Sequence, residues 1–572
     1  MRMTKGVFAV LANSSPQGKP SGFDGAVSRC SHALRELNGH EPERFASGGR
    51  YLLGSVTAPG EFGAPSMIIG DGRDLSVRVD ISEGLATVGT DDVGLSQLCW
   101  GAKAGIVVIS NSALAVAAGI GAAVSPSAVA MLSLTGFLFG GRTLFEGVRR
   151  LQGGESVVHR PGEMPRVVVS DVESSFGGSV HEGGADILSE VVRRLHDAHP
   201  GALLELSGGL DSRAVLAAIP AASRSGRLAV TLGNPGQPDV VIAEELARRS
   251  GLEWMLIDQT DLRDLTAEDL RRRIRESSRR RDCMFNALAA VLLDDADAKI
   301  PAGPRFTGAN GEFARGFYYP GVITDGRVTR RRTAQLARWR LFTNDGTAAT
   351  ALVPNIVADA RHDTVEILHA ELAHQMSWRV AVDEFYLRGR MANWAGPSYS
   401  ARRPASPALG PFFHPSFLNW ARALPRRSVE RERRFAQLVT DLDPLLADVP
   451  LDRGPTVASL TAGGPYDNFR RALTVGRKVV RKFDQRVRKL ARPPNLSDDL
   501  IELTRWAWRS SDSAALEEVG LFGSDFLRKL EEGVPIDGPA LSLALNVASA
   551  TTFLAAVANS SHETELANDR EL

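Results

Sequence analysis

Cysteine is scarce in this sequence, which contains only Cys30, Cys99 and Cys283. Three widely separated cysteines are too few for a disulfide framework or a zinc knuckle. An excess of either charge is also missing, because 67 basic residues balance 67 acidic ones. A balanced chain has no global attraction to nucleic acid or to an anionic membrane, so any anion site must be local. The scarce cysteines suit a reducing cytosol, and we expect a cytoplasmic protein with no nucleic-acid partner.

Charged residues are absent between Ala104 and Gly140, a stretch long enough to span a bilayer. Serine, asparagine and proline interrupt this stretch, and most of its residues are small. We therefore expect buried strands and a helix of a soluble domain, and no membrane span. Residues 1–11 carry two basic residues and only a short apolar run, a pattern that predicts no signal peptide.

The chain is long enough for two or more domains, and its pattern changes once. Residues 1–173 contain short β-rich runs separated by glycine and proline turns, which predict a mostly β domain. Residues 174–184 are rich in glycine and serine and read as a linker. From 185 to 572, strands first alternate with helices, and the rest is helical. Such alternation predicts a parallel sheet with right-handed crossovers, so the expected fold class is α/β and α+β in two domains.

Two basic runs, Arg271–Arg281 and Arg477–Arg492, stand out in the second half. Runs of this kind are usually solvated helix faces, and that is our expectation here. The alternative is a docking surface for an acidic partner or peptide.

The most informative string is LLELSGGLDSRAVLAAI, residues 203–219. A hydrophobic strand passes into a glycine-rich turn and then directly into a helix. Glycines let the backbone approach a ligand, and hydroxyls and free amides at a helix start present donors to an anion. A Walker A loop is excluded, because no lysine follows a glycine at the required position. The predicted phosphate-binding residues are Ser207, Gly208, Gly209, Leu210, Asp211 and Ser212.

Acidic and basic residues accompany this phosphate loop. The Asp211 carboxylate would be repelled by phosphate unless a cation intervened, so we predict that it binds Mg²⁺. A second glycine-rich turn, residues 307–312, contains Gly308 and Gly311 and ends at Glu312, the predicted second metal ligand. Arg315 follows and is expected to neutralise pyrophosphate.

The Ser-Gly-Gly-x-Asp-Ser form after a strand resembles the pyrophosphate-binding loop of N-type ATP pyrophosphatases, which cleave ATP to AMP and pyrophosphate. Residues 307–312 are similar to the second motif of that family. The resemblance extends over most of the chain to asparagine synthetases, and it implies ATP and Mg²⁺ as cofactors and a HUP-like second domain. Thr231, Leu232 and Gly233 end a strand at the edge where such sheets bind ligands, and we expect the adenine there, contacted by backbone.

The first domain resembles a class II glutamine amidotransferase, a nucleophile-hydrolase-like sandwich. Gly6-Val7-Phe8-Ala9 is similar to its opening strand, and residues 91–100, 109–118 and 136–154 to later segments. Glutamine-hydrolysing members carry a cysteine directly before the opening strand, and its own amine is the base. Lys5 occupies that position, and the glutamine-binding Asn-Gly-Glu motif is absent. This domain is therefore predicted to be structural, and the amine must come from elsewhere.

The same loss is known in β-lactam synthetases and in lasso-peptide macrolactam cyclases. β-Lactam synthetases use a tyrosine in the second loop and asparagine synthetases a glutamate, whereas this chain has Ala309. The family's catalytic lysine is also missing. Arg433 and Arg434 lie in its expected neighbourhood and could hold negative charge without acting as a base. Tyr386, Arg390 and Trp394 are expected to be buried packing, with an acceptor pocket as the alternative.

The resemblance thus implies a ligase that adenylates a carboxylate and closes an amide, with a peptide macrolactam preferred over a small molecule. The expected partners are a peptide or small-molecule substrate and, for a peptide, its precursor and leader peptidase. The alternatives are a small-molecule lactam or amide synthetase, an ammonia-using amidating enzyme and a nucleotide-binding pseudoenzyme scaffold.

Overall fold

The computed structural model describes most of the chain. The described residues are 2–3, 7–13, 22–47, 50–54, 56–58, 67–70, 73–81, 85–169, 183–319, 326–344, 346–402, 405–425, 427–451, 456–461, 501–502, 504–505, 508 and 510–571. Lys5, residues 174–182 of the predicted linker and the basic run Arg477–Arg492 lie outside them.

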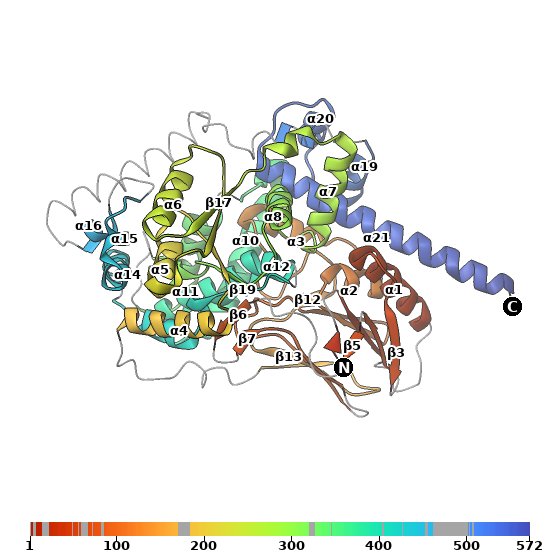
Figure 1. Ribbon diagram of the computed structural model, residues 1–572. Helices are drawn as coiled ribbons and strands as arrows, with labels where there is room; N and C mark the ends of the chain where they lie inside the picture. The colour runs from red at the N-terminus through yellow and green to blue at the C-terminus, as the bar shows by residue number, and fades with distance from the viewer. Residues whose placement is uncertain are drawn as a thin grey trace.

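The N-terminal part contains two antiparallel sheets (Figure 1). The six-stranded sheet has the order β12-β10-β11-β2-β4-β3, and the four-stranded sheet β14-β13-β9-β8. Their strands are β2 (Ala9–Asn13), β3 (Glu43–Ser47), β4 (Arg50–Gly54), β8 (Arg78–Ile81), β9 (Ala86–Gly89), β10 (Cys99–Lys103), β11 (Ile106–Ser110), β12 (Val148–Arg150), β13 (Glu155–His159) and β14 (Arg166–Val169). A separate pair joins β1 (Arg2–Met3) to β5 (Val56–Ala58).

Alternation along the strands explains how these two sheets pack. Phe8 and Val10 join Val88 and Val157 of the smaller sheet in one apolar cluster, so the sheets face each other. Leu11 points the other way and belongs to the main core with helices α1 (Phe23–Asn38) and α2 (Ala113–Ile120). The N-terminal part is therefore a helix layer on a two-sheet sandwich.

The largest sheet has seven strands in the order β17-β16-β15-β18-β19-β6-β7. All pairs are parallel except β6 with β7. The strands are β6 (Met67–Gly70), β7 (Arg73–Leu75), β15 (Leu203–Glu205), β16 (Leu228–Leu232), β17 (Glu253–Ile257), β18 (Arg305–Phe306) and β19 (Ala408–Leu409). By sequence β6 and β7 belong to the predicted first domain, yet they extend the sheet of the second.

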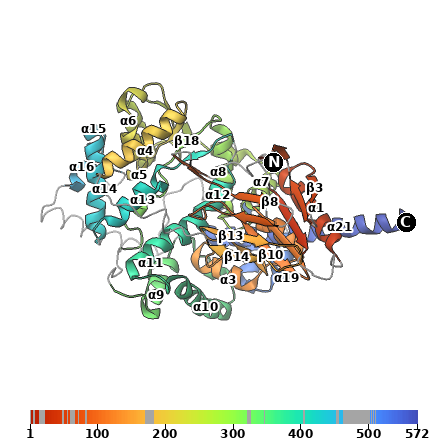
Figure 2. The ribbon, with the colours of Figure 1, turned by 90° about the horizontal axis from the view of Figure 1, so that it is seen from below.

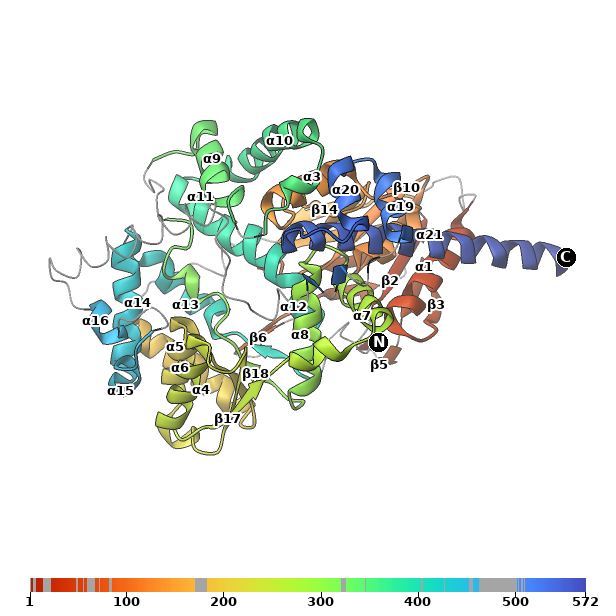
Figure 3. The same cartoon turned by 90° about the horizontal axis from the view of Figure 1, so that it is seen from above.

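The remaining helices lie beside the parallel sheet or against the N-terminal part (Figures 2 and 3). They are α3 (Pro126–Thr135), α4 (Gly184–Ala198), α5 (Leu210–Ala218), α6 (Pro238–Arg249), α7 (Ala267–Arg279), α8 (Ala287–Lys299), α9 (Arg330–Leu336), α10 (Pro354–Leu372), α11 (Trp378–Glu384), a π-helix (Phe385–Ala395), α12 (Gly396–Ser400), α13 (Pro415–Ala423), α14 (Ser428–Leu442), α15 (Pro444–Ala447), α16 (Val457–Thr461), α19 (Ser510–Val519), α20 (Ser524–Glu531) and α21 (Gly538–Glu571). Helix α21 contacts α1 and α2 of the N-terminal part as well as α7 and α8, and its end projects from the body. A mixed α/β fold with several sheets, as predicted, is confirmed.

The uncharged stretch 104–140 forms strand β11 and helices α2 and α3, which are mostly buried. Among the described residues, one helical segment is long and apolar enough to cross a membrane: Gly538–Ser561, within α21. Of the apolar stretch of this segment, 67% is buried inside the protein, which is compatible with a core helix of a soluble protein.

The basic run Arg271–Arg281 matches the expected solvated face only in part, because Arg272 and Arg280 are exposed and other arginines of the run are not. Arg271 and Arg275 form ion pairs with Asp512 of α19 at 2.9 and 2.6 Å, and Arg281 pairs with Asp294 of α8 at 2.7 Å. These arginines bind acidic residues of their own chain.

Candidate functional site

The turn after β15 is held in shape by its serine hydroxyls. Ser212 Oγ accepts from the Ser207 backbone N–H at 3.1 Å and lies 3.1 Å from Ser207 Oγ. The Gly209 N–H donates to Ser207 Oγ at 3.2 Å, and α5 begins at Leu210. The first amides of a helix have no partner within it, so this turn has N–H donors of the kind that bind anions.

Arg213 fixes the same turn from behind. Its side chain is 0% exposed and donates to the carbonyls of Gly208, Leu446, Val449 and Pro450 at 2.5 to 3.3 Å. Burial lowers the pKa of this guanidinium to about 10, so it is still charged at neutral pH. Arg213 thus ties the turn to the segment that follows α15.

The second glycine-rich turn, residues 307–312, packs directly on the first. A Cβ added to Gly308 would lie 2.7 Å from the Ser212 nitrogen, and one added to Gly311 would lie 2.5 Å from Asp211 Oδ1. No side chain fits at such distances, so both positions need glycine for the turns to meet. The sequence predicted that these turns form one site, and the structure brings them together.

Asp211 lies at the contact between the two turns. Arg315 Nη2 is 2.5 Å from Asp211 Oδ2 and 3.9 Å from Glu312 Oε1. Burial raises the pKa of Asp211 to about 6; Arg315 opposes this shift and the Glu312 charge adds to it. Asp211 Oδ1 is buried and has no hydrogen-bond partner among the described residues.

The carboxylates of Asp211 and Glu312 could hold a divalent cation. The orphaned Asp211 Oδ1 supports this, because a buried oxygen without a donor favours a metal ion. No group of three or more histidine, cysteine or acidic side chains with metal-site geometry occurs among the described residues. Mg²⁺ commonly takes one or two protein carboxylates and completes its shell with phosphate oxygens and water, so two carboxylates fit it.

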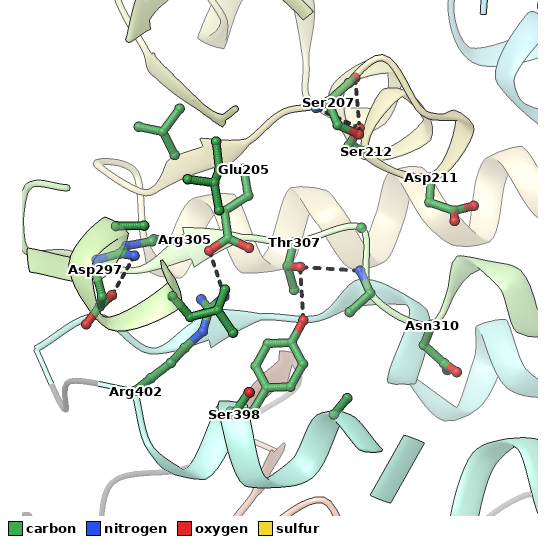
Figure 4. A pocket seen from close by; sticks show the side chains of 18 of the residues that line it. Glu205, Ser207, Asp211, Ser212, Asp297, Arg305, Thr307, Asn310, Ser398 and Arg402 are labelled. Atoms are coloured by element: carbon green, nitrogen blue, oxygen red, sulfur yellow. Dashed lines mark hydrogen bonds and ion pairs between the residues drawn. The ribbon is translucent and has the colours of Figure 1, made fainter. Parts of the chain in front are cut away.

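A cavity of about 550 Å³ opens beside the two turns (Figure 4). Six of the predicted residues of the two glycine-rich turns line it: Ser207, Gly209, Asp211, Ser212, Gly308 and Glu312. Leu232 lines it as well, as does Ala309. In Figure 4, Ser212 and Asp211 lie at one end, Asp297, Arg305 and Arg402 at the other, and Thr307 between them.

Other predicted binding residues support the site without lining the cavity. Thr231 points to the opposite face of the sheet, because side chains alternate along a strand, and its hydroxyl donates to the Leu206 carbonyl. Gly233 leaves room for Val240, since a Cβ there would lie 2.7 Å from Val240 Cγ2. Gly208 packs against Asp239 in the same way. Leu210, Gly311 and Arg315 likewise do not line the cavity, and of the predicted backbone edge for adenine only Leu232 reaches it.

The two arginines predicted to be catalytic, Arg433 and Arg434, lie on α14 and do not line the cavity. Arg434 is exposed and Arg433 is half-buried. Their neighbour Phe435 is nearer the site, with its ring 5.8 Å from the Arg315 guanidinium carbon.

Of the three residues of the π-helix that were expected to be buried packing, Tyr386 is buried and Trp394 is not. Tyr386 is buried, lines the cavity and donates from its hydroxyl to Glu312 at 3.4 Å. Trp394 also lines the cavity and is 43% exposed. Arg390 stacks between the rings of Phe317 and Trp394 at 4.6 and 4.7 Å.

Two ion pairs in the cavity wall escaped the sequence-based prediction. Glu205 pairs with Arg402, and Asp297 pairs with Arg305, each at 2.7 Å. A sequence signal was present for the first pair only, because Glu205 lies in a strand of a parallel sheet, and such strands are usually apolar throughout.

No protein-family model and no curated protein matches this chain. The chemistry therefore has to be inferred from the site. Its parts are a glycine-rich turn at a helix start, two carboxylates beside a guanidinium, and an adjoining cavity with apolar walls and paired charges.

Proposed function

We propose that this chain is an ATP- and Mg²⁺-dependent carbon–nitrogen ligase. It adenylates a substrate carboxylate and couples the product to an amine of the substrate, as a peptide macrolactam cyclase of the lasso type. The observation that carries the proposal is the contact between the two glycine-rich turns, which gathers Asp211, Glu312 and Arg315 beside a helix start. Two carboxylates, a guanidinium and free amides suit a triphosphate with its cation.

The reaction has two steps. A carboxylate oxygen attacks the α-phosphorus of ATP, the new oxygen–phosphorus bond forms, and the bond to the bridging oxygen breaks to release pyrophosphate. The amine nitrogen then attacks the acyl carbon, the carbon–oxygen bond to AMP breaks, and the nitrogen loses its proton to solvent. One molecule of water is lost from the substrate overall.

The side chains of the site have distinct roles in these steps. The turn 207–212 binds the departing pyrophosphate through backbone amides and serine hydroxyls, and Arg315 offsets its charge. Mg²⁺, when held by Asp211 and Glu312, neutralises phosphate oxygens. The cavity walls keep the acyl-adenylate from water and position the amine.

The domain assignment follows the same proposal. We assign residues 1–173 to a degenerate amidotransferase-like domain, of which β6 and β7 extend the sheet of the second domain. Residues 174–184 are the linker, and residues 185–572 are an ATP-pyrophosphatase domain with a HUP-like sheet and a helical C-terminal part. Lys5 stands where glutamine-hydrolysing relatives carry cysteine. The substrate therefore brings its own amine, and Ala309 leaves room for a peptide beside the cavity. The partners are a precursor peptide and its leader peptidase in the cytoplasm.

Pyrophosphate release tests the function. The purified protein is incubated with ATP, Mg²⁺ and peptides that have a free amino terminus and an internal aspartate or glutamate. We expect peptide-dependent release of pyrophosphate, and a peptide product lighter by one water. If the preparation binds ATP but gives neither pyrophosphate nor a lighter peptide with any of these peptides, the ligase proposal is wrong and a nucleotide-binding scaffold is favoured. Turnover only with ammonium salts and free amino acids assigns an amidating enzyme instead.

A further inference from the structure

One face of the parallel sheet carries charges where apolar side chains are expected. The register pairs Glu205 with Val230, and Arg305 with Leu203, two residues before Glu205. Because side chains alternate along each strand, Glu205, Arg305 and Val230 all point to one face. Helix α8 covers that face and contributes Asp297. These charges therefore line one end of the cavity.

Several N–H and O–H donors in this part of the cavity have no acceptor. Arg305 is 2% exposed; its Nη1 binds Asp297, whereas its Nε and Nη2 have no partner among the described residues. Arg402 Nη1 and Ser398 Oγ are likewise buried without a partner there. The Arg402 guanidinium is held over the Tyr399 ring at 4.9 Å. Buried donors of this kind indicate a ligand that supplies acceptors.

Charge and shape restrict that ligand. Arg305 and Arg402 are each balanced by one carboxylate, so this end of the cavity is neutral and an added anion would be uncompensated. The adjoining wall is apolar and contains Val230, Leu232, Ile257 and Ile300. A neutral, flat heterocycle with ring acceptors fits both conditions. The same cavity reaches Ser207 and Ser212, where phosphates are expected.

We propose that the base of the nucleotide binds at this charged end of the cavity and is selected by side chains. This inference rests on the proposed use of ATP. The ring nitrogens accept from Arg402 and Arg305, and the exocyclic amine donates to Glu205. The base thus lies deeper on the sheet face than the backbone edge Thr231–Leu232–Gly233, and Arg402 is a specificity-determining residue.

Nucleotide binding tests this inference without any need for turnover. The probes are adenosine, ATP, GTP and inorganic pyrophosphate, and affinities are measured by calorimetry. We expect Arg402→Gln to weaken adenosine and ATP binding by the same factor, about ten-fold, because the lost contact is to the base. Pyrophosphate affinity stays unchanged, which also shows that the variant is folded. We also expect the ratio of ATP affinity to GTP affinity to be smaller in Arg402→Gln than in the wild type.

Two further variants complete the design. Ser207→Ala has the opposite pattern and weakens pyrophosphate and ATP but not adenosine. Arg193→Gln, an exposed arginine of α4, is the matched control and changes none of the affinities. The double variant with Glu205→Gln and Arg402→Gln removes both charges of the ion pair. It therefore tests the proposed contact with the base without leaving an unpaired carboxylate.

The inference is wrong if Arg402→Gln weakens pyrophosphate as much as adenosine, since the arginine is then a phosphate ligand. It is also wrong if adenosine affinity and the ATP preference do not change, which would assign the charged end to another group. If the wild-type protein binds ATP but forms no amide, the proposed ligase activity is wrong and the proposed base site is not affected. If the wild-type protein does not bind adenosine, the proposed base site is wrong, whatever the result of the ligase assay.

Discussion

Gly311 lies against Asp211 so closely that even a methyl group on Gly311 would be 2.5 Å from the carboxylate. The second turn can therefore reach the first only because this position lacks a side chain. Gly311→Ala must push the turns apart and separate Glu312 from Asp211. We expect pyrophosphate release to fall about ten-fold or more, because the proposed metal ligands move.

The control for this substitution is Gly201→Ala. A Cβ at Gly201 has no atom within 4 Å, and its φ angle is not in the left-handed region. We expect wild-type activity for it. Equal activity of the two alanine variants would show that the contact between the turns is not needed.

Asp211→Asn tests the predicted metal ligand. The amide has the same shape but no negative charge, so we expect loss of pyrophosphate release on the order of a hundred-fold. Asp197→Asn, an exposed carboxylate on α4 that pairs with Arg193, provides the comparison and should keep full activity. Substantial turnover of Asp211→Asn at saturating Mg²⁺ would remove Asp211 from the metal site.

The raised pKa of Asp211 predicts how stability depends on pH. Burial holds the folded-state pKa at about 6, above the value of 3.8 expected for an unperturbed aspartate. The folded protein thus binds this proton more tightly than the unfolded chain, and the carboxylate lowers stability increasingly as pH rises from about 4 to 6. Above that window the loss is constant.

The measurement is urea unfolding with EDTA across this pH window. Asparagine does not titrate, so the free energy of unfolding of Asp211→Asn relative to the wild type should increase between these pH values and then level off. A difference that does not vary with pH would show that Asp211 is not perturbed.

Arg213 predicts a large stability effect outside the reacting groups. Arg213→Met leaves several buried carbonyls without a donor, and we expect the free energy of unfolding to fall by about 3 kcal/mol. Arg248→Met removes a 70% exposed side chain that pairs with Glu245, and it should leave the free energy of unfolding nearly unchanged. Similar losses in both variants would mean that the carbonyls find other donors.

Local signals explain which elements the sequence could predict. Strands β15, β16 and β17 and helices α4, α5 and α6 lie where hydrophobic runs, helical spacing and glycine turns placed them. Strands β18 and β19 have only two residues each, and partners distant in the chain determine them. No local pattern identifies such short strands.

The same distinction applies to the site. The two glycine-rich turns were predictable because a turn between a strand and a helix presents its own backbone groups. Arg402 was not, because its partner Glu205 is remote in sequence and was interpreted as part of a buried strand. Arg433 and Arg434 were predicted because they lie near the expected place of the family's lysine in the sequence, whereas the fold decides which face of α14 approaches the cavity.

Strand β6 has a consequence for how the protein is made. Met67 pairs with Ala408, so β6 has no partner in the parallel sheet until most of the chain has left the ribosome. An exposed strand edge during synthesis invites pairing with other chains. Separate expression of the two halves should therefore give insoluble fragments, and the order of synthesis leaves assembly of this sheet to a late folding event.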